Sequence, residues 1–358
     1  MRSKVFIIRV ANRESGKLVA AKLDKLIKES HALDFLEKGQ SVVVKMHFGE
    51  AGNTGYVRPE YVRVACREIA AHGAKPFLSD TNTLYNGKRT NSKDHFDLAR
   101  EHGFRKENIL AEVIIPDDSQ AENVKEIRLN SEYVKIAKIA RIFWEAGAIV
   151  GIAHFKGHLM TGFGGALKNL GMGCATRSGK LFQHSDIAPY VIIKNCKECK
   201  ACLAVCPARA VILRDGKAFI DSAKCVGCAS CIAACKYYAI DVKWESGGDL
   251  IQEKMVEYAQ AVLSNKKGKA VFFNFCLKIT QECDCLAKDD PRIVPDIGIL
   301  VSRDPVAVDK ACFDLIGKSA GKDILKELHP KRDGMKQFKH AAKLGLGNLE
   351  YDLVEVRG

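Results

Sequence analysis

Eight of the fourteen cysteines in the 358-residue chain form two copies of one spacing, C-x2-C-x2-C-x3-C. A cubane [4Fe–4S] cluster is held by four thiolates, and with this duplicated spacing the fourth ligand of each cluster comes from the other copy. The spacing therefore predicts two [4Fe–4S] clusters whose ligands cross between the copies. We assign one cluster to Cys196, Cys199, Cys202 and Cys235, and the other to Cys225, Cys228, Cys231 and Cys206.

Zinc ribbons and disulfide frameworks also use C-x-x-C pairs. Zinc ribbons rarely add a fourth cysteine at the x3 distance, so the repeat favours clusters. Because the spacing is that of a bacterial two-cluster ferredoxin, we expect a small α+β ferredoxin-like module at 189–244. Within it, Asp215 and Gly216 are expected to form the turn of a hairpin. Thiolate ligands need a reducing compartment, which indicates a cytoplasmic protein.

A second set of reactive side chains follows β-rich runs outside this module. His47 lies just past the run 41–46, and Asp80 just past the run 75–78. His154, Lys156 and His158 follow the run 148–153. Loops after parallel strands meet at one edge of a sheet, so we predict that these side chains converge in a catalytic site. Such a set suits an anionic substrate, proton transfer or a metal. The alternative is that each histidine only satisfies nearby backbone groups.

Three glycines, Gly162, Gly164 and Gly165, precede a predicted helix at 165–171 that carries Lys168. Bare amides at such a loop can bind an anion, which makes these four residues candidates for cofactor binding. Close packing of the loop against the sheet is the alternative explanation. The glycine spacing departs from the dinucleotide fingerprint, so we expect no NAD-type site.

Cys283 and Cys285 form a C-x-C pair in a polar loop. Such a pair can chelate one metal ion, so we predict a third metal or redox centre here, with Cys174 as a further ligand and a histidine to complete it. The other three cysteines lie in apolar contexts and are expected in the core: Cys66, Cys276 and Cys312.

Short strands and amphipathic helices alternate before and after the cysteine repeat. The predicted strands are 5–10, 41–46, 75–78, 148–153, 270–275 and 297–301. The predicted helices are 16–37, 59–72, 91–102, 132–146, 249–264 and one opened by Asp304 and Pro305. This alternation predicts an α/β fold with a mostly parallel sheet covered by helices on both faces. We expect one α/β domain formed by 1–188 and 245–358, interrupted by the module.

The chain has a net charge of +13, and the module is itself basic. A basic rim favours an acidic redox protein as partner. No aromatic and basic interleaving accompanies the charge, so we expect no nucleic-acid partner. The apolar run near the start is too short for a signal peptide, and no stretch of eighteen apolar residues predicts a membrane span.

Several segments outside the repeat resemble the iron–sulfur members of the family known as domain of unknown function 362. They are 45–50 (KMHFGE), 79–85 (SDTNTLY), 154–174, the triplet 283–285 (CDC), and 294–309 from VPDIGI to DPVAVD. The resemblance covers nearly the whole chain and implies a ferredoxin module at this same place. One departure is Lys236, where the first copy of the repeat has Pro207. That position shapes the turn and does not affect ligation.

We interpret the chain as an iron–sulfur oxidoreductase in which the module exchanges electrons with an active site in the α/β domain. A non-enzymatic electron-transfer adapter is the first alternative, in which the α/β domain docks partners. A metal or cluster maturation factor that uses Cys174, Cys283 and Cys285 is the second.

Overall fold

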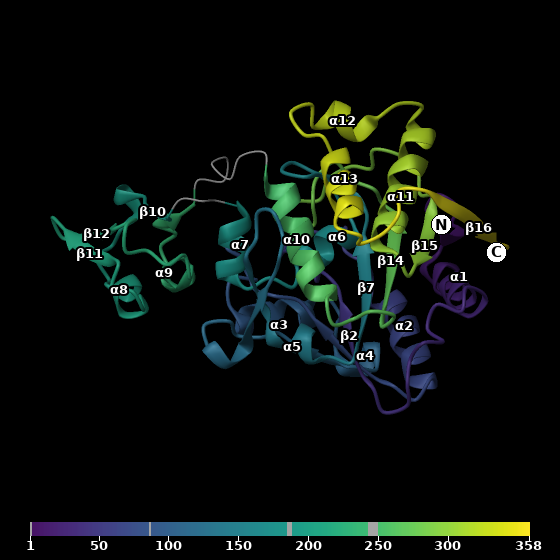
Figure 1. Cartoon of the computed structure of the whole chain (residues 1–358), viewed down its shortest axis with the longest axis horizontal. Coiled ribbons are helices and arrows are strands. Elements are labelled where there is room, and N and C mark those ends of the chain that lie inside the picture. The colour runs from purple at the N-terminus through teal and green to yellow at the C-terminus, as the bar shows by residue number, and fades with distance from the viewer. Residues whose placement is uncertain (1, 86, 185–187, 243–249) are drawn as a thin grey trace.

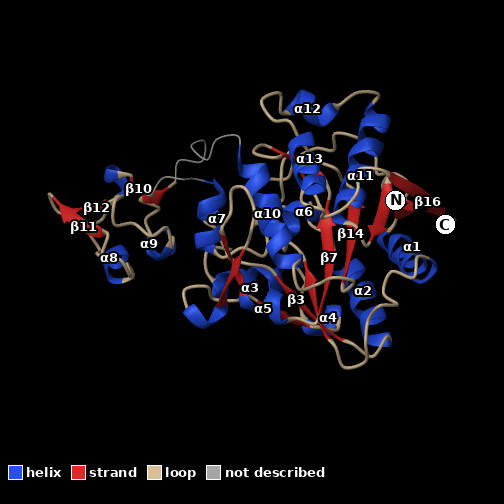
Figure 2. Ribbon diagram, viewed as in Figure 1, coloured by secondary structure: helices blue, strands red, loops and turns tan. Residues whose placement is uncertain are grey.

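The computed structural model describes residues 2–85, 87–184, 188–242 and 250–358. Its largest feature is an eight-stranded sheet (Figure 2). Neighbouring strands are parallel except where β15 pairs antiparallel with β1 and β14, so the sheet is mostly parallel, as predicted. In spatial order the strands are β16 (Tyr351–Val356), β1 (Ser3–Arg9), β15 (Gly298–Ser302), β14 (Ala270–Cys276), β7 (Ala148–His154), β2 (Ser41–Lys45), β3 (Lys75–Ser79) and β4 (Glu112–Ile114).

Helices cover both faces of the sheet, and each face has its own apolar core. Side chains alternate along β2, so Val42 and Val44 pack in one core and Val43 packs in the other. The first core receives α1 (Gly16–Glu29), α2 (Pro59–Ala71), α3 (Ser92–Glu101) and α4 (Lys106–Ile109). The second receives α5 (Arg141–Glu145), α6 (Ala166–Gly171), α10 (Ile251–Leu263), α11 (Pro305–Ala320), α12 (Ile324–Leu328) and α13 (Met335–Lys343). The predicted fold class is confirmed.

The start of α11 shows how the sequence sets a helix boundary. The Asp304 carboxylate accepts hydrogen bonds from the amides of Val306 and Ala307, at 2.8 and 2.9 Å. Pro305 occupies the first helical position, where its missing N–H costs nothing. Among the described residues, no helix combines the length and the apolar character that crossing a bilayer requires.

The predicted helix at 132–146 is wrong. Residues Ile136–Ala140 form strand β6, which pairs with β5 (Val124–Arg128), and only α5 is helical. The β-branched residues of this stretch favour a strand once a partner strand is available. The helix predicted at 16–37 ends early, at Glu29, and strands β4, β5 and β16 were not predicted. The predicted start of α10 at residue 249 lies outside the described residues.

Residues 188–242 form a small unit beside the α/β layers, in teal and green in Figure 1. Asp215 and Gly216 both have positive φ, 49° and 78°, so the predicted hairpin turn is confirmed. The boundary predicted at 244/245 lies outside the described residues, and the domain limits stay a prediction. The unit contains β10 (Tyr190–Val191), η2 (Ile193–Asn195), α8 (Ala201–Ala204), β11 (Val211–Arg214), β12 (Lys217–Ile220), α9 (Ser230–Ala234) and β13 (Ile240–Asp241).

Four elements remain, and all but the first contribute residues to the site described next. They are η1 (Ala121–Asn123), β8 (Lys156–His158), β9 (Gly162–Gly164) and α7 (Arg177–His184), with β8 and β9 forming an antiparallel hairpin.

Candidate functional site

A cavity of about 350 Å³ lies where strands β2, β3 and β7 end. Parallel strands deliver the loops that follow them to a common edge, which explains why residues far apart in sequence meet here. Ten of the predicted site residues line this one cavity: His47, Asp80, His154, Lys156, His158, Gly164, Gly165, Lys168, Cys283 and Cys285. Among the described residues, Gly162 and Cys174 do not line it.

Asp80 lies in the cavity wall as a buried counter-ion. Its carboxylate is 3.0 Å from the Lys45 ammonium and 3.7 Å from the Arg89 guanidinium. Burial by itself would raise the pKa of Asp80, but the nearby charges of Lys45 and Lys180 oppose burial, and the pKa lies well below the ordinary value. Asp80 is therefore ionised at neutral pH, and its role is to hold cations in place.

His47 is held as a neutral imidazole. Its Nε2 atom lies 2.7 Å from Arg89, and its Nδ1 atom accepts from the Gly49 amide at 3.0 Å. Burial, and then the charge of Arg89, lower the pKa of His47 well below its ordinary value. Arg89 is itself fully buried and is paired with Glu50 at 3.2 Å.

Asp284, between the two cysteines of the C-x-C pair, fixes their loop. Its carboxylate lies 2.9 Å from His154 Nδ1 and 2.9 Å from Lys156 Nζ. Its carbonyl accepts from the Glu50 amide at 2.9 Å. His154 and Lys156 thus connect the end of β7 to the loop that carries the cysteines.

Cys283, Cys285 and His158 form a tight group. One ligand atom from each lies within 4.8 Å of the others, and in the described part of the chain no other set of three His, Cys, Asp or Glu residues is this close. Lys168 Nζ lies 3.5 Å from Cys283 Sγ. A hydrogen bond from Cys285 lowers the pKa of Cys283 well below its ordinary value, with Lys168 and Lys156 assisting against burial. The same hydrogen bond, together with burial, raises the pKa of Cys285.

The glycine loop packs closely and does not cradle an anion at the helix start. The amides of Ala166 and Leu167 already donate to Asp309, at 2.6 and 2.9 Å. A Cβ atom at Gly165 would lie 2.2 Å from the Asp309 carboxylate. Gly162 packs against the Gly334 backbone, away from the cavity. Close packing therefore explains these glycines, while Lys168 reaches the cavity.

We expect Asp309 to contribute more to the stability of the folded protein as the pH falls from about 6 to about 4. Burial raises its pKa to about 6, whereas an unfolded aspartate titrates at about 4. Between these values the folded protein binds more protons than the unfolded chain, so stability falls as pH rises through this window. Asp309→Asn should remove on the order of 2 kcal/mol of this pH dependence, measured by urea denaturation of both proteins across the window. Parallel profiles for the two proteins would contradict the assignment.

Cys174 does not join the C-x-C group, which corrects the predicted ligand set. It is fully buried in the apolar core beneath β6 and α6, and burial raises its pKa to about 12. Cys66, Cys276 and Cys312 are buried as predicted.

Sequence reasoning missed most of the cations that surround the cavity. Lys45, Arg89 and Lys180 line it together with Lys156 and Lys168. Burial lowers the pKa of Lys180 to about 7, and its ammonium donates to Thr81 Oγ1 at 2.7 Å. Lys45 lies in the segment 45–50 that carries the family resemblance, but no motif in the sequence identifies Arg89 or Lys180 as site residues. The cavity lining is therefore strongly cationic.

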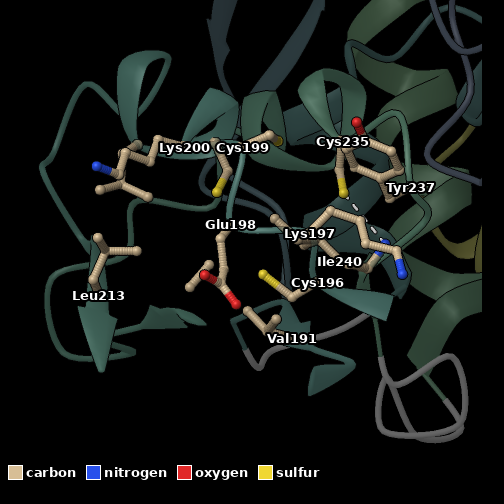
Figure 3. Close-up of a pocket in the computed structure, with 14 residues that line it drawn as sticks. Val191, Cys196, Lys197, Glu198, Cys199, Lys200, Leu213, Cys235, Tyr237 and Ile240 are labelled. Atoms are coloured by element: carbon tan, nitrogen blue, oxygen red, sulfur yellow. Dashed lines mark hydrogen bonds between the residues drawn. The ribbon is translucent and has the colours of Figure 1, made fainter. Parts of the chain in front are cut away.

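The eight repeat cysteines separate into two groups of four. One small cavity is lined by Cys196, Cys199, Cys202 and Cys235, and Figure 3 shows the sulfur atoms of Cys196, Cys199 and Cys235 around a common space. A second cavity is lined by Cys206, Cys225, Cys228 and Cys231. The last cysteine of each copy therefore lines the cavity of the other copy.

The two copies of the repeat also share backbone geometry. Positive φ occurs at Glu198 and Lys200 in the first copy and at the equivalent Gly227 and Ala229 in the second. The last cysteine of each copy accepts from the amide four residues later: Ala210 donates to Cys206 Sγ at 3.2 Å, and Ala239 to Cys235 Sγ at 3.3 Å. Left-handed residues turn each loop around its cavity, and N–H donors to sulfur suit bound thiolates. The donor sets fit two cubane clusters.

The second cysteine cavity lies close to the large cavity. A Cβ atom at Gly227 would lie 3.8 Å from the Leu181 side chain of α7. Leu84 and Leu181 belong to the same apolar cluster as Cys202 and Cys231. Leu84 also lines the large cavity, so apolar side chains connect the two regions.

The chain was compared with protein families and known structures. The model of the family described as Domain of unknown function (DUF362) matches residues 42–314. The lactate racemase apoprotein from Thermoanaerobacterium thermosaccharolyticum is 12% identical with a TM-score of 0.37, over 76% of this chain and 51% of that chain. A crystal structure of a Thermotoga maritima protein from a structural genomics consortium is 12% identical with a TM-score of 0.44, over 86% of this chain and 60% of that chain. This chain thus spans about half of the first and three fifths of the second. A comparison with curated proteins gave no match.

Proposed function

This chain belongs to the DUF362 family, and from that premise we propose that it is an iron–sulfur oxidoreductase. The eight repeat cysteines would hold two [4Fe–4S] clusters, and the substrate of the redox reaction would bind in the large cavity. When bound, the clusters supply one-electron transfer. The remaining work belongs to the chain's own residues, which bind the substrate, exclude water and hold protons.

The observation that carries this proposal is the division of the eight cysteines into two cavities of four. In a zinc ribbon, two C-x-x-C pairs together bind one metal ion. Here, instead, the last cysteine of each copy lines the cavity of the other copy. That crossing is the ligand pattern of two-cluster ferredoxins. The amide donors to Cys206 and Cys235 support the same ligands.

The charge of the large cavity defines the class of substrate. Five ammonium or guanidinium groups line it, against the single carboxylate of Asp80. Asp80 is already paired with Lys45 and Arg89, and Asp284 pairs with Lys156, which leaves Lys168 beside the C-x-C pair. A small anionic substrate compensates the positive charge of the cavity lining.

A basic module surface supports an acidic redox protein as the electron partner. Residues 188–243 carry nine Lys or Arg and four Asp or Glu, a net charge of 9 − 4 = +5. Lys197, Lys200 and Lys224 are exposed on it. Opposite charges steer association and make its rate depend on salt. Cluster thiolates require a reducing compartment, which supports the cytoplasm as the proposed location.

A maturation factor is the second candidate, because His158, Cys283 and Cys285 approach one another as metal ligands do. In that function the C-x-C pair holds a transferable ion.

Iron analysis tests the proposed function. Anaerobically purified and reconstituted protein is expected to hold about eight irons, because two cubanes contain four each. Electron paramagnetic resonance of the reduced protein should show two interacting clusters. Fewer than about six irons after full reconstitution, or zinc bound to the repeat cysteines, would reject the assignment.

A further inference from the structure

We propose that Cys283 and Cys285 form a dithiol–disulfide redox couple in the wall of the large cavity. The proposal deepens the proposed function and rests on it for the source of electrons. It replaces the third metal centre that the C-x-C spacing suggested, and it names the group that receives electrons before the substrate does.

The two sulfur atoms are placed for this chemistry. They lie within 4.8 Å of one another, and both residues line the cavity. The side chain of Asp284, between them, is fixed by His154 and Lys156. The loop is therefore held in place, which keeps both thiols at the cavity.

The hydrogen bonds of His158 favour a thiol couple over a metal. Its Nδ1 atom accepts from the amides of Met160 and Thr161, at 3.1 and 3.2 Å. A neutral imidazole with an accepting Nδ1 carries its proton on Nε2. His158 also forms a side-chain hydrogen bond with Cys283, so Nε2–H donates to the sulfur. Metal-ligating histidines show the opposite pattern, because they donate from the nitrogen that does not bind the metal.

The position of Lys168 also favours a thiol couple over a metal site. Its ammonium lies 3.5 Å from Cys283 Sγ, where it stabilises a thiolate and repels a metal cation. Cys283 therefore has two cationic or N–H donors of its own, from Lys168 and His158. A cysteine with a cationic neighbour beside a second cysteine is the arrangement of exchange-active pairs.

The reduction balances with the groups present. The S–S bond of the oxidised pair accepts two electrons and one proton and breaks. Cys283 becomes a thiolate paired with Lys168, and Cys285 takes the proton. Two bound [4Fe–4S] centres would supply the two electrons, one from each centre. The reduced couple then holds two electrons beside an anionic substrate.

A single tryptic peptide allows a direct test. Cleavage after Lys278 and Lys288 releases residues 279–288, in which Cys283 and Cys285 are the only cysteines. The holoprotein is oxidised anaerobically with a mild oxidant, alkylated in denaturant and analysed by mass spectrometry. We expect this peptide to escape alkylation and to be lighter by two hydrogens. After reduction with a low-potential viologen it should carry two labels. The same digest contains residues 270–278, whose single Cys276 should be alkylated in every state.

Variants separate the possible outcomes. In the double variant Cys206→Ser and Cys235→Ser, viologen should no longer reduce the pair, while dithiothreitol should. A disulfide that dithiothreitol reduces but intact clusters do not would support the couple and overturn the electron route of the proposed function. Two alkylated thiols under all conditions would overturn the couple. So would one zinc or iron ion per chain, beyond the clusters, that both Cys283→Ser and Cys285→Ser release.

Discussion

Cys206→Ser is expected to remove one cluster and leave the other. Cys206 lines the cavity of Cys225, Cys228 and Cys231, although it follows Cys202 in the sequence. Loss of one thiolate from a four-cysteine set should lower the iron content from about eight to about four. Iron analysis and electron paramagnetic resonance of the reduced protein measure the result, and the remaining cluster should give the spectrum of an isolated, non-interacting centre.

Cys235→Ser supplies the reciprocal variant, because Cys235 lines the cavity of the first copy. Its remaining cluster should differ from that of Cys206→Ser, since the two surroundings differ. Cys66→Ser is the matched control: Cys66 is buried on α2 in the apolar core and should leave the iron content unchanged. Loss of the cluster held by Cys196, Cys199 and Cys202 in Cys206→Ser would show that ligation does not cross between the copies.

The sequence predicts much of the sheet because its strands carry strong local signals. Runs such as Val42–Val44 and the glycines that follow helices are readable in one dimension, and the structure agrees closely at β2, β3 and β7. Residues 136–140 were wrongly predicted to be helical because their apolar spacing also fits a helix. Its state depends on pairing with β5, and such a pairing is invisible to periodicity.

The residues of the site also divide into those that local sequence signals predict and those that depend on tertiary packing. Residues that follow strands are predictable, since the topology fixes where His47, Asp80 and His154 must lie. Arg89 and Lys180 come from a loop and a helix, and they reach the cavity only through tertiary packing. The glycine loop shows the reverse error: its spacing suggests an anion site, but Asp309 on α11 supplies the anion internally. Asp309, which is distant in sequence, therefore occupies the amides that the glycine motif was predicted to offer to a ligand.

Asp80→Asn is expected to destabilise the α/β domain strongly. The carboxylate is 3% exposed and pairs with Lys45 and Arg89, which are each 1% exposed. The amide keeps the shape of the side chain but removes its charge, so two buried cations lose their shared counter-ion. Breaking a buried ion pair in this way costs about 3–5 kcal/mol. Urea denaturation followed by far-UV circular dichroism at neutral pH measures the loss.

The pH dependence of the stability of the unsubstituted protein also tests the interaction of Asp80 with Lys45 and Arg89. The pKa of Asp80 is depressed in the folded state, so its contribution is fully present above the unfolded value of about 4 and is lost as the pH falls below it. The difference in stability between parent and Asp80→Asn should therefore shrink in acid. Asp34→Asn is the control, since Asp34 is 60% exposed beside His31 and should change stability by less than about 1 kcal/mol. An Asp80→Asn variant no less stable than this control would mean that solvent or a rearranged side chain neutralises Lys45 and Arg89, and that Asp80 does not organise the cavity.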